Sequence, residues 1–438
     1  MMRKAKTAVL LLLAVALLSL SGCYSGNIDQ YFSLPQPTDE FLQLQELIDR
    51  EITTGSEYAS PVGGEYRQSV QLFDLNGDGV NEALAFFRER DKSLKIIVYS
   101  ADSGSFREVL SLRGEGRAIG SIDYADMDED GETDLLVAWQ VSPGMNTLNA
   151  YDLTEWSGDI LLGTECTEFL TADMDRDGHS ELLILRAAAS ETYLADMYYI
   201  RAGHEYQASS AYLSAGILDF RQFRTVTIQD GSTALLVEST LENGDLATDL
   251  LICRDGSLTN LTLNHNTGVS ELCRSYTLVS AQDIDGDGHT ELPVPSRLYS
   301  DTDDVFWTIA WYAYDLSGRA ATHAVTYHCF PDSWYLTLPS GWEIGLTVRR
   351  DSSVYGEHAV TLSRLGSDGS VNDLLTIYTL TGENRTDRAA IDGRFILREE
   401  ESTIYACRIE LETLQERQVE NMFHIIYADW GFGSVYGG

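Results

Sequence analysis

Basic residues are scarce in this chain. Its 438 residues include 30 Lys and Arg against 68 Asp and Glu, which gives a formal net charge of −38. No stretch of the sequence forms a basic stripe. Nucleic-acid binding requires clusters of Lys and Arg that neutralise phosphates. The composition therefore argues against a nucleic-acid partner, and the same acidity disfavours direct binding to an anionic lipid surface.

Sequence motifs of common enzyme chemistries are missing as well. The chain has no Gly-x-Ser-x-Gly nucleophile, no phosphate-binding glycine loop and no His-Glu-x-x-His zinc motif. Its six cysteines form no Cys-x-x-Cys pair, so a zinc site is unsupported. Cys253 and Cys273 could form a disulfide, or they could be buried thiols. We predict no catalytic residue, although a pair of catalytic carboxylates among the many acids stays open.

What the chain does contain is one short acidic loop, present four times. The four copies are DLNGDGVNE (74–82), DMDEDGETD (126–134), DMDRDGHSE (173–181) and DIDGDGHTE (283–291). Each copy has an oxygen-bearing side chain at positions 1, 3, 5 and 9 and glycine at position 6. Calcium takes six to eight oxygen ligands, and glycine permits the sharp turn that such a loop requires.

We therefore predict four calcium sites. The predicted side-chain ligands are Asp74, Asn76, Asp78, Glu82, Asp126, Asp128, Asp130, Asp134, Asp173, Asp175, Asp177, Glu181, Asp283, Asp285, Asp287 and Glu291. The backbone carbonyl of position 7 adds an oxygen from Val80, Glu132, His179 and His289. A metal-free turn rich in Asp and Asn is the alternative for each loop. Magnesium is less suitable because it retains several waters, and the expected role of the calcium is structural.

The residues after each loop distinguish these sites from EF-hands. An EF-hand requires a bidentate Glu at position 12 and a helix on each side. Position 12 is Ala85, Val137, Ile184 or Val294 here, and strand-like apolar segments follow the loops. Position 9 is therefore expected to close the site, with the loop joining two strands. The pattern resembles the FG-GAP and VCBS repeats of β-propellers, in which the loop binds calcium between two strands of a blade.

The loops also set a repeat length. The Asp-Gly pair at positions 5 and 6 recurs at residues 78, 130, 177 and 287, in steps of 52, 47 and 110 residues. The last step is about twice the others, and a degenerate copy with Asp230-Gly231 lies within it. We predict a mainly β fold in which residues 65–328 form a β-propeller of about five blades.

The N-terminal region is predicted to target and anchor the protein. Residues 1–22 have a basic start and a short apolar run, as a signal peptide does. The Leu-Ser-Gly-Cys sequence ending at Cys23 looks like a bacterial lipobox, so Cys23 is the expected lipidation site. Residues 23–64 are predicted to form a tether and one short helix. The apolar face of this helix consists of Phe41, Leu44, Leu47, Ile48 and Ile52.

The last part of the chain fits the repeat poorly. We predict a small α+β module over residues 329–438, with an amphipathic helix of about four turns between Leu414 and Trp430. Two further degenerate blades are the alternative, and they would raise the number to seven. The aromatic residues of the 307–314 segment could line a sugar-binding groove, but in a propeller such residues more often pack between blades.

These features predict an extracytoplasmic lipoprotein that is attached to the bacterial cell membrane through Cys23. Its calcium-stabilised propeller is expected to bind a protein or a glycan at the cell surface. The layout resembles uncharacterised surface lipoproteins with VCBS-like repeats, a resemblance that implies no biochemical activity. The alternatives are a polysaccharide-active lyase or hydrolase on a propeller scaffold, and a structural component of an envelope complex.

Overall fold

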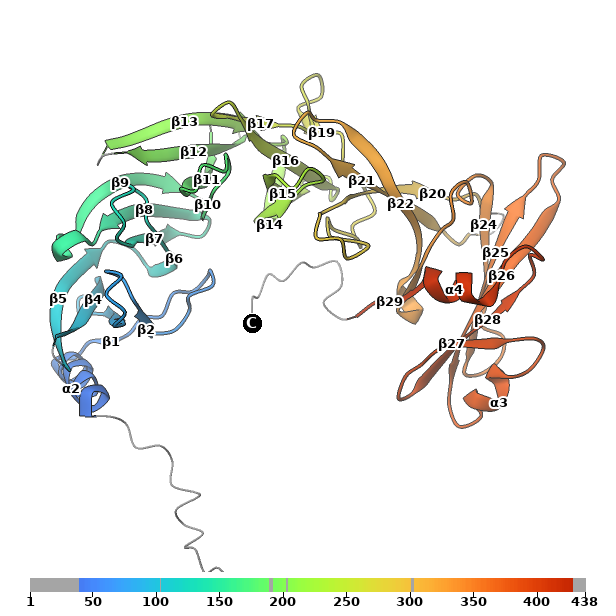
Figure 1. Cartoon of the computed structure of the whole chain (residues 1–438), viewed down its shortest axis with the longest axis horizontal. Helices are drawn as coiled ribbons and strands as arrows, with labels where there is room; N and C mark the ends of the chain where they lie inside the picture. The colour runs from blue at the N-terminus through green and yellow to red at the C-terminus, as the bar shows by residue number, and fades with distance from the viewer. Residues whose placement is uncertain (1–38, 103, 189–191, 202–203, 301–302, 428–438) are drawn as a thin grey trace, which may run out of the picture.

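Antiparallel sheets follow one another along an arc in this protein (Figure 1). The structure is a computed structural model that describes residues 39–102, 104–188, 192–201, 204–300 and 303–427. The predicted signal peptide, Cys23 and the first part of the tether lie outside the described residues. Among the described residues, no helix has the length and apolar character needed to span a membrane. The predicted mainly β fold class is confirmed.

Six sheets of four or five strands make up the arc within the described residues. The first sheet contains β1 (Glu57–Tyr58), β2 (Val70–Phe73), β3 (Glu82–Arg88), β4 (Leu94–Asp102) and β5 (Ser105–Gly114). The second contains β6 (Ala118–Ala125), β7 (Asp134–Ser142), β8 (Met145–Asp152) and β9 (Asp159–Cys166). The third contains β10 (Glu168–Ala172), β11 (Glu181–Ala187), β12 (Tyr193–Arg201) and β13 (His204–Tyr212).

The fourth sheet contains β14 (Ile217–Thr227), β15 (Thr233–Leu241), β16 (Leu246–Arg254) and β17 (Ser257–Asn260). A small hairpin of β18 (Leu263–Asn264) and β19 (Val269–Ser270) follows it. The fifth sheet contains β20 (Leu292–Arg297), β21 (Trp307–Tyr314), β22 (Ala320–Cys329), β23 (Trp334–Thr337) and β29 (Phe423–Ile425). The sixth contains β24 (Leu346–Asp351), β25 (Glu357–Leu365), β26 (Val371–Thr381), β27 (Phe395–Glu399) and β28 (Thr403–Ile409). The helices are α2 (Asp39–Thr54), α3 (Arg385–Ala389) and α4 (Glu416–Met422).

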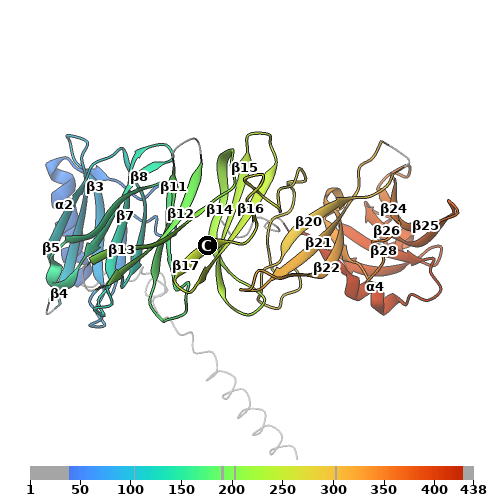
Figure 2. The same cartoon turned by 90° about the horizontal axis from the view of Figure 1, so that it is seen from above.

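The sheets stand face to face, so their central strands are buried on both sides (Figure 2). In β7, Leu135 and Val137 pack against the first sheet, whereas Leu136 and Ala138 pack against the third. Successive side chains of a strand point to opposite faces of its sheet. A strand that is buried on both faces therefore needs apolar residues at nearly every position. This explains why the second strand of each repeat is a nearly continuous apolar run in the sequence.

Helices cover the outer faces of the two end sheets. Leu44 and Ile48 of α2 pack on Ala85 and Phe87 of the first sheet, with Leu47 and Ile52 beside them. Phe41, the remaining residue of the predicted apolar face, is exposed. At the other end, Ala389 of α3 packs on the sixth sheet. In a closed propeller the first and last blades would cover each other. The described residues instead form an open arc, with helices serving as caps as they do in other stacked repeats.

The observed sheets do not follow the predicted boundary between residues 328 and 329. Residues 65–328 contain most of the first five sheets. The boundary predicted after residue 328 lies inside β22, and the fifth sheet is completed by β23 and by β29 from near the C-terminus. A sixth sheet and two short helices occupy most of the segment that was expected to be an α+β module.

The helix predicted between Leu414 and Trp430 is wrong in its length. Helix α4 ends at Met422, and the next three residues form β29. Phe423 and His424 pair with β23. The His424 ring stacks on that of Tyr335, and the Phe423 ring meets that of Trp334 at a tilt. The free edge of the fifth sheet supplies this pairing, which a helical pattern in the sequence does not reveal. Trp430 lies outside the described residues.

Cysteines and aromatic residues mostly belong to the core. Cys253 and Cys273 are free thiols, so the possible disulfide between them does not form. Trp311 is fully buried, and its indole N–H donates a hydrogen bond to Thr326 Oγ1 (2.7 Å). This arrangement supports packing rather than sugar binding for Trp311.

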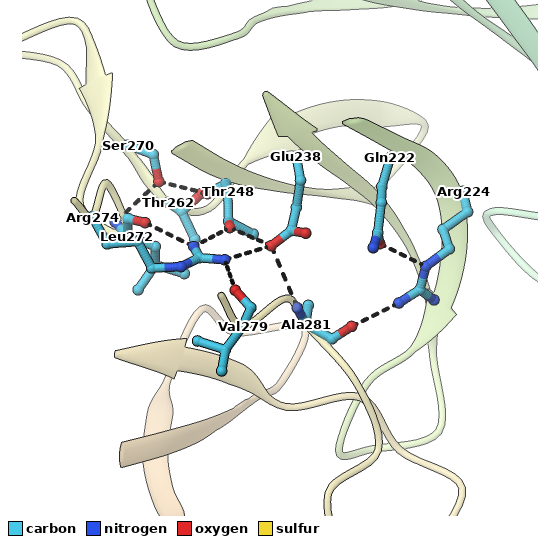
Figure 3. A network of polar contacts seen from close by, with 10 residues as sticks. All are labelled: Gln222, Arg224, Glu238, Thr248, Thr262, Ser270, Leu272, Arg274, Val279 and Ala281. Carbon is cyan, nitrogen blue, oxygen red and sulfur yellow. Dashed lines mark hydrogen bonds and ion pairs between the residues drawn. The ribbon is translucent and has the colours of Figure 1, made fainter. Parts of the chain in front are cut away.

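A buried ion pair joins the fourth sheet to the segment leading into the fifth (Figure 3). Glu238 on β15 is fully buried, and Arg274 after β19 is 7% exposed. Arg274 Nη2 lies 2.8 Å from Glu238 Oε1 and also donates to the carbonyl of Val279 (2.8 Å). Its Nη1 donates to Thr248 Oγ1 (2.7 Å). These contacts fix a long connection that contains little regular structure.

Replacing Arg274 by Met tests the importance of this pair. The variant leaves the Glu238 carboxylate buried without a countercharge, so the free energy of unfolding should fall by about 3 to 5 kcal/mol. Chemical denaturation in calcium measures the change. Arg254→Met is the matched control, because Arg254 ends β16 and is exposed. Equal stability of the two variants would show that the ion pair does not hold the fourth and fifth sheets together.

Candidate metal sites

Three of the acidic loops join two paired strands, as predicted: β2 to β3, β6 to β7 and β10 to β11. The fourth loop comes directly before β20, the first strand of the fifth sheet. The residue before position 1 pairs with position 9 in the first three loops, where the pairs are Phe73–Glu82, Ala125–Asp134 and Ala172–Glu181. In the fourth loop the same pairing is an isolated bridge between Gln282 and Glu291. Position 9 therefore starts the following strand in the first three loops and lies one residue before β20 in the fourth.

Hydrogen bonds of the backbone fold the four loops in the same way. The N–H of Gly79, Gly131, Gly178 and Gly288 donates to Oδ2 of the Asp at position 1, at 3.0, 3.0, 3.1 and 2.8 Å. These glycines have φ values between +87° and +94°. A residue with a Cβ is strained in this region, so the turn requires glycine at position 6.

Position 9 is the most deeply buried part of each loop. Glu82, Asp134, Glu181 and Glu291 are at most 2% exposed. One oxygen of each accepts the backbone N–H of position 2, at 3.0, 2.8, 2.8 and 3.1 Å. The side chains at position 2 are themselves buried; they are Leu75, Met127, Met174 and Ile284. Sequence reasoning missed this apolar anchor, although all four loops carry it.

Several carboxylate oxygens of the loops remain without a hydrogen-bond partner. Buried oxygens of this kind among the described residues are Asp74 Oδ1, Asp126 Oδ1, Asp128 Oδ1, Glu181 Oε1 and Glu291 Oε1. The loop backbone thus engages one oxygen of a carboxylate and leaves the other free. A buried charged oxygen without a partner is costly, and a cation would remove this cost. The residues present therefore fit a bound metal ion.

The carboxylates at positions 1, 3 and 9 converge in three loops. Ligand atoms lie within 4.8 Å of one another in the groups Asp126–Asp128–Asp134, Asp173–Asp175–Glu181 and Asp283–Asp285–Glu291. The first loop has the amide of Asn76 at position 3, and Glu82 Oε1 accepts a hydrogen bond from Ser100 (3.1 Å). Its acids alone form no such group among the described residues.

The predicted ligand residues at positions 5 and 7 of each loop contact each other in this structure. Oδ1 of Asp78, Asp130, Asp177 and Asp287 accepts the backbone N–H of position 7, at 2.7, 2.8, 2.9 and 2.8 Å. The residues at position 7 are Val80, Glu132, His179 and His289. The His289 ring also lies 3.1 Å from Asp287 Oδ1. These contacts hold the turn and leave the carbonyl of position 7 outside this hydrogen bond.

Burial perturbs the acidity of the loops. Desolvation raises the pKa of Asp134 to about 8 and that of Glu181 to about 7, and the neighbouring loop carboxylates add to the shift. The pKa values of Glu82 and Glu291 are raised for the same main reason. The hydrogen bond from position 2 opposes the shift in each case without cancelling it. These acids therefore favour a proton or a cation near neutral pH.

Side chains from other strands approach the loops. His323 Nε2 on β22 lies 2.6 Å from Asp285 Oδ2, and with Asp287 the two residues form a fourth group that can hold a metal ion. The Tyr199 hydroxyl donates to Asp175 Oδ2 (3.0 Å), and Thr154 Oγ1 donates to Asp130 Oδ2 (2.5 Å). The sequence gives no signal for these contacts, because the partners lie 24 to 38 residues apart.

The degenerate fifth copy forms a plain turn. Gly231 has φ of +75°, and the N–H of Ser232 donates to Asp230 Oδ1 (3.0 Å). The other oxygen of Asp230 accepts the N–H of Leu316 (2.9 Å). Both oxygens of Asp230 are thus engaged within the protein.

Comparisons with known proteins leave the family open. No protein-family model matches the chain, and no curated protein matches it. The solved structures to which it is similar include the rhamnogalacturonan lyase YesW, with 11% identity, 84% of this chain and 76% of that chain covered, and a TM-score of 0.30. They also include Bacillus licheniformis rhamnogalacturonan lyase PL11 (10% identity, 82% and 91% covered, TM-score 0.30). A third is the WD40 domain of SCAP from fission yeast (14% identity, 75% and 66% covered, TM-score 0.26). Likenesses this weak carry no argument about activity.

The metal-free protein should become more stable as the pH falls from about 8 to about 5. The folded-state pKa of Asp134 (about 8) exceeds its ordinary value of 3.8, and that of Glu181 (about 7) exceeds 4.5. The folded state therefore binds protons more tightly than the unfolded state, and this contribution is lost as the pH rises through the raised values. Thermal unfolding in chelator at several pH values measures the trend. Asp134→Asn should reduce the slope, and an unchanged slope would contradict the assignment.

Glu181→Gln tests the role of position 9 in one loop. Glutamine can still accept the N–H of Met174, but it removes the buried charge, so the third loop should lose its tight calcium site. Calorimetric titration should then find one site fewer than in the unmodified protein. Asp230→Asn in the degenerate copy is the control, and it should leave the number of sites unchanged. Equal stoichiometry in the two variants would show that position 9 does not ligate a metal.

Proposed function

We propose that this protein is a lipid-anchored, extracytoplasmic binding module built on a calcium-stabilised scaffold of propeller-like sheets. The observation that carries the proposal is the repeated loop, in which buried carboxylate oxygens converge without a hydrogen-bond partner among the described residues. Four copies of one arrangement in one chain favour a shared ligand over coincidence. The proposed ligand is a hard cation.

Calcium suits these loops better than other ions. Their ligands are carboxylates, an amide in the first loop and backbone carbonyls, and calcium prefers oxygen ligands of this kind. Extracytoplasmic calcium also matches the location that the lipobox at Cys23 implies. When bound, the ion would neutralise the carboxylates of the loop and hold together the chain segments on either side of it. The proposed role of the ion is structural.

The scaffold gives a reason to propose binding. The first strands β6, β10 and β14 lie next to one another on the concave side of the arc (Figure 1). A curved stack of repeats offers an extended concave surface of the kind that repeat proteins use for recognition. The proposed partner is a protein or a glycan at the cell surface. The strongly acidic composition continues to argue against nucleic acid.

Cys23→Ser tests location and binding together. The variant should leave the membrane fraction and appear in the medium, because it lacks the residue that would be lipidated. Added back in calcium, the released protein should bind to cells of the producing strain, and chelator should remove this binding. Retention of Cys23→Ser in the membrane fraction would contradict the lipid anchor. Binding to cells that is equal in calcium and chelator, or absent in both, would contradict the calcium-stabilised binding module.

A further inference from the structure

A cavity of about 530 Å³ lies on the concave side of the arc. Its walls come from the segment 63–67 and from β6, β10 and β14, so four separate parts of the chain build it. The volume is within the range of sites for small molecules or for a few sugar units. None of the acidic loops contributes to its walls. The cavity is therefore distinct from the candidate metal sites.

The wall formed by residues 63–67 is fixed in place. The N–H groups of Val62 and Gly63 donate to the carbonyls of Ile119 and Gly120, at 2.9 and 2.7 Å. Gly64 has φ of +75°, and a Cβ there would lie 3.0 Å from the Cβ of Ser121. Glycine thus lets this segment lie directly on β6. The cavity exists before any ligand arrives.

Aromatic rings and charged groups share the lining. Tyr66 meets Tyr124 edge to face with 4.9 Å between ring centroids, and Phe220 meets Tyr193 in the same way at 4.9 Å. These contacts hold both rings in place at the wall. Phe169 and Phe223 add further apolar surface. Held rings of this kind offer flat faces on which the C–H groups of a sugar ring can pack.

The charges of the lining are balanced, unlike those of the whole chain. The chain has 68 acidic residues against 30 Lys and Arg. The cavity is lined by three carboxyl groups and three guanidinium groups, from Glu65, Asp123, Glu168, Arg67, Arg221 and Arg224. A site with this balance does not select a strongly charged ligand. It offers both hydrogen-bond acceptors and donors, as a polyhydroxylated ligand requires.

Part of this polar lining is available to a ligand. Glu65, Glu168 and Arg221 have exposed side chains and no hydrogen-bond or ion-pair partner within the described part of the chain. Asp123 is held in place, since Thr171 Oγ1 donates to its Oδ2 (2.8 Å) and the N–H of Tyr124 donates to its Oδ1 (2.9 Å). Desolvation raises the pKa of both Asp123 and Glu168.

We propose that this cavity binds a neutral oligosaccharide, with Glu168 and Arg221 as hydrogen-bonding residues and the aromatic rings as packing surfaces. This inference rests on the proposed function, because it names the ligand class for that binding module. Carboxylate and guanidinium groups pair with adjacent sugar hydroxyls, and the rings cover the apolar face of the sugar. The ligand would contact the first strands of three successive sheets.

Calorimetric titration of the full chain in calcium tests the proposal. The probes are neutral oligosaccharides of four to six hexose or pentose units, an oligosaccharide of uronic acids and an unrelated peptide mixture. At least one neutral oligosaccharide should bind. Glu168→Ala and Arg221→Ala should each weaken that binding at least tenfold. The matched controls are Glu165→Ala and Arg254→Ala, which alter exposed residues outside the cavity and should change the affinity less than twofold.

The same samples separate the two proposals. Binding only of the uronic acid oligosaccharide or of peptides, or no loss in Glu168→Ala and Arg221→Ala, would overturn the assignment of the cavity. Thermal unfolding with and without calcium is measured in parallel, and it also shows that each variant is folded. Calcium stabilisation without any sugar binding would overturn only the inference about the cavity. Absence of calcium stabilisation would instead overturn the proposed scaffold.

Discussion

A buried carboxylate in a sheet strand, or one residue before it, is the constraint on which much of this structure depends. Four sheets carry it at position 9 of an acidic loop, next to oxygens that lack hydrogen-bond partners among the described residues. The fourth sheet has no acidic loop, but its second strand carries the fully buried Glu238, which pairs with Arg274. A charge in such a position requires a counterion. Arg274 provides one in the fourth sheet, and Arg394 provides one for the buried Glu357 on β25 of the sixth sheet.

The stacking of the sheets follows from their apolar central strands. Each of these strands has two apolar faces, and each face requires a neighbouring sheet or a cap. Helix α2 and helix α3 provide the caps at the two ends, so the arc can remain open. The first strands of neighbouring sheets then line the concave side, where the cavity with balanced charge lies. Stability and recognition would thus use different parts of the same repeat.

Features that are local in the sequence were predictable from it. The ligands, the turn glycine and the closing acid of each loop lie within nine consecutive residues, so the strand–loop–strand arrangement could be inferred without a structure. Features that depend on distant contacts were not. His323 approaches Asp285 from another strand, and Phe423 joins a free sheet edge instead of continuing a helix. The cavity could not be predicted from the sequence either, because its walls come from four separate segments of the chain.

The central claim is that the four loops bind calcium and thereby neutralise the buried acids. Native mass spectrometry of the full chain, after exchange into dilute calcium, counts the bound ions directly. The account predicts four tightly bound calcium ions per chain, which are lost after treatment with chelator. A chain that carries no tightly bound calcium would show that the loops are turns stabilised by protons and hydrogen bonds alone, and it would contradict the account.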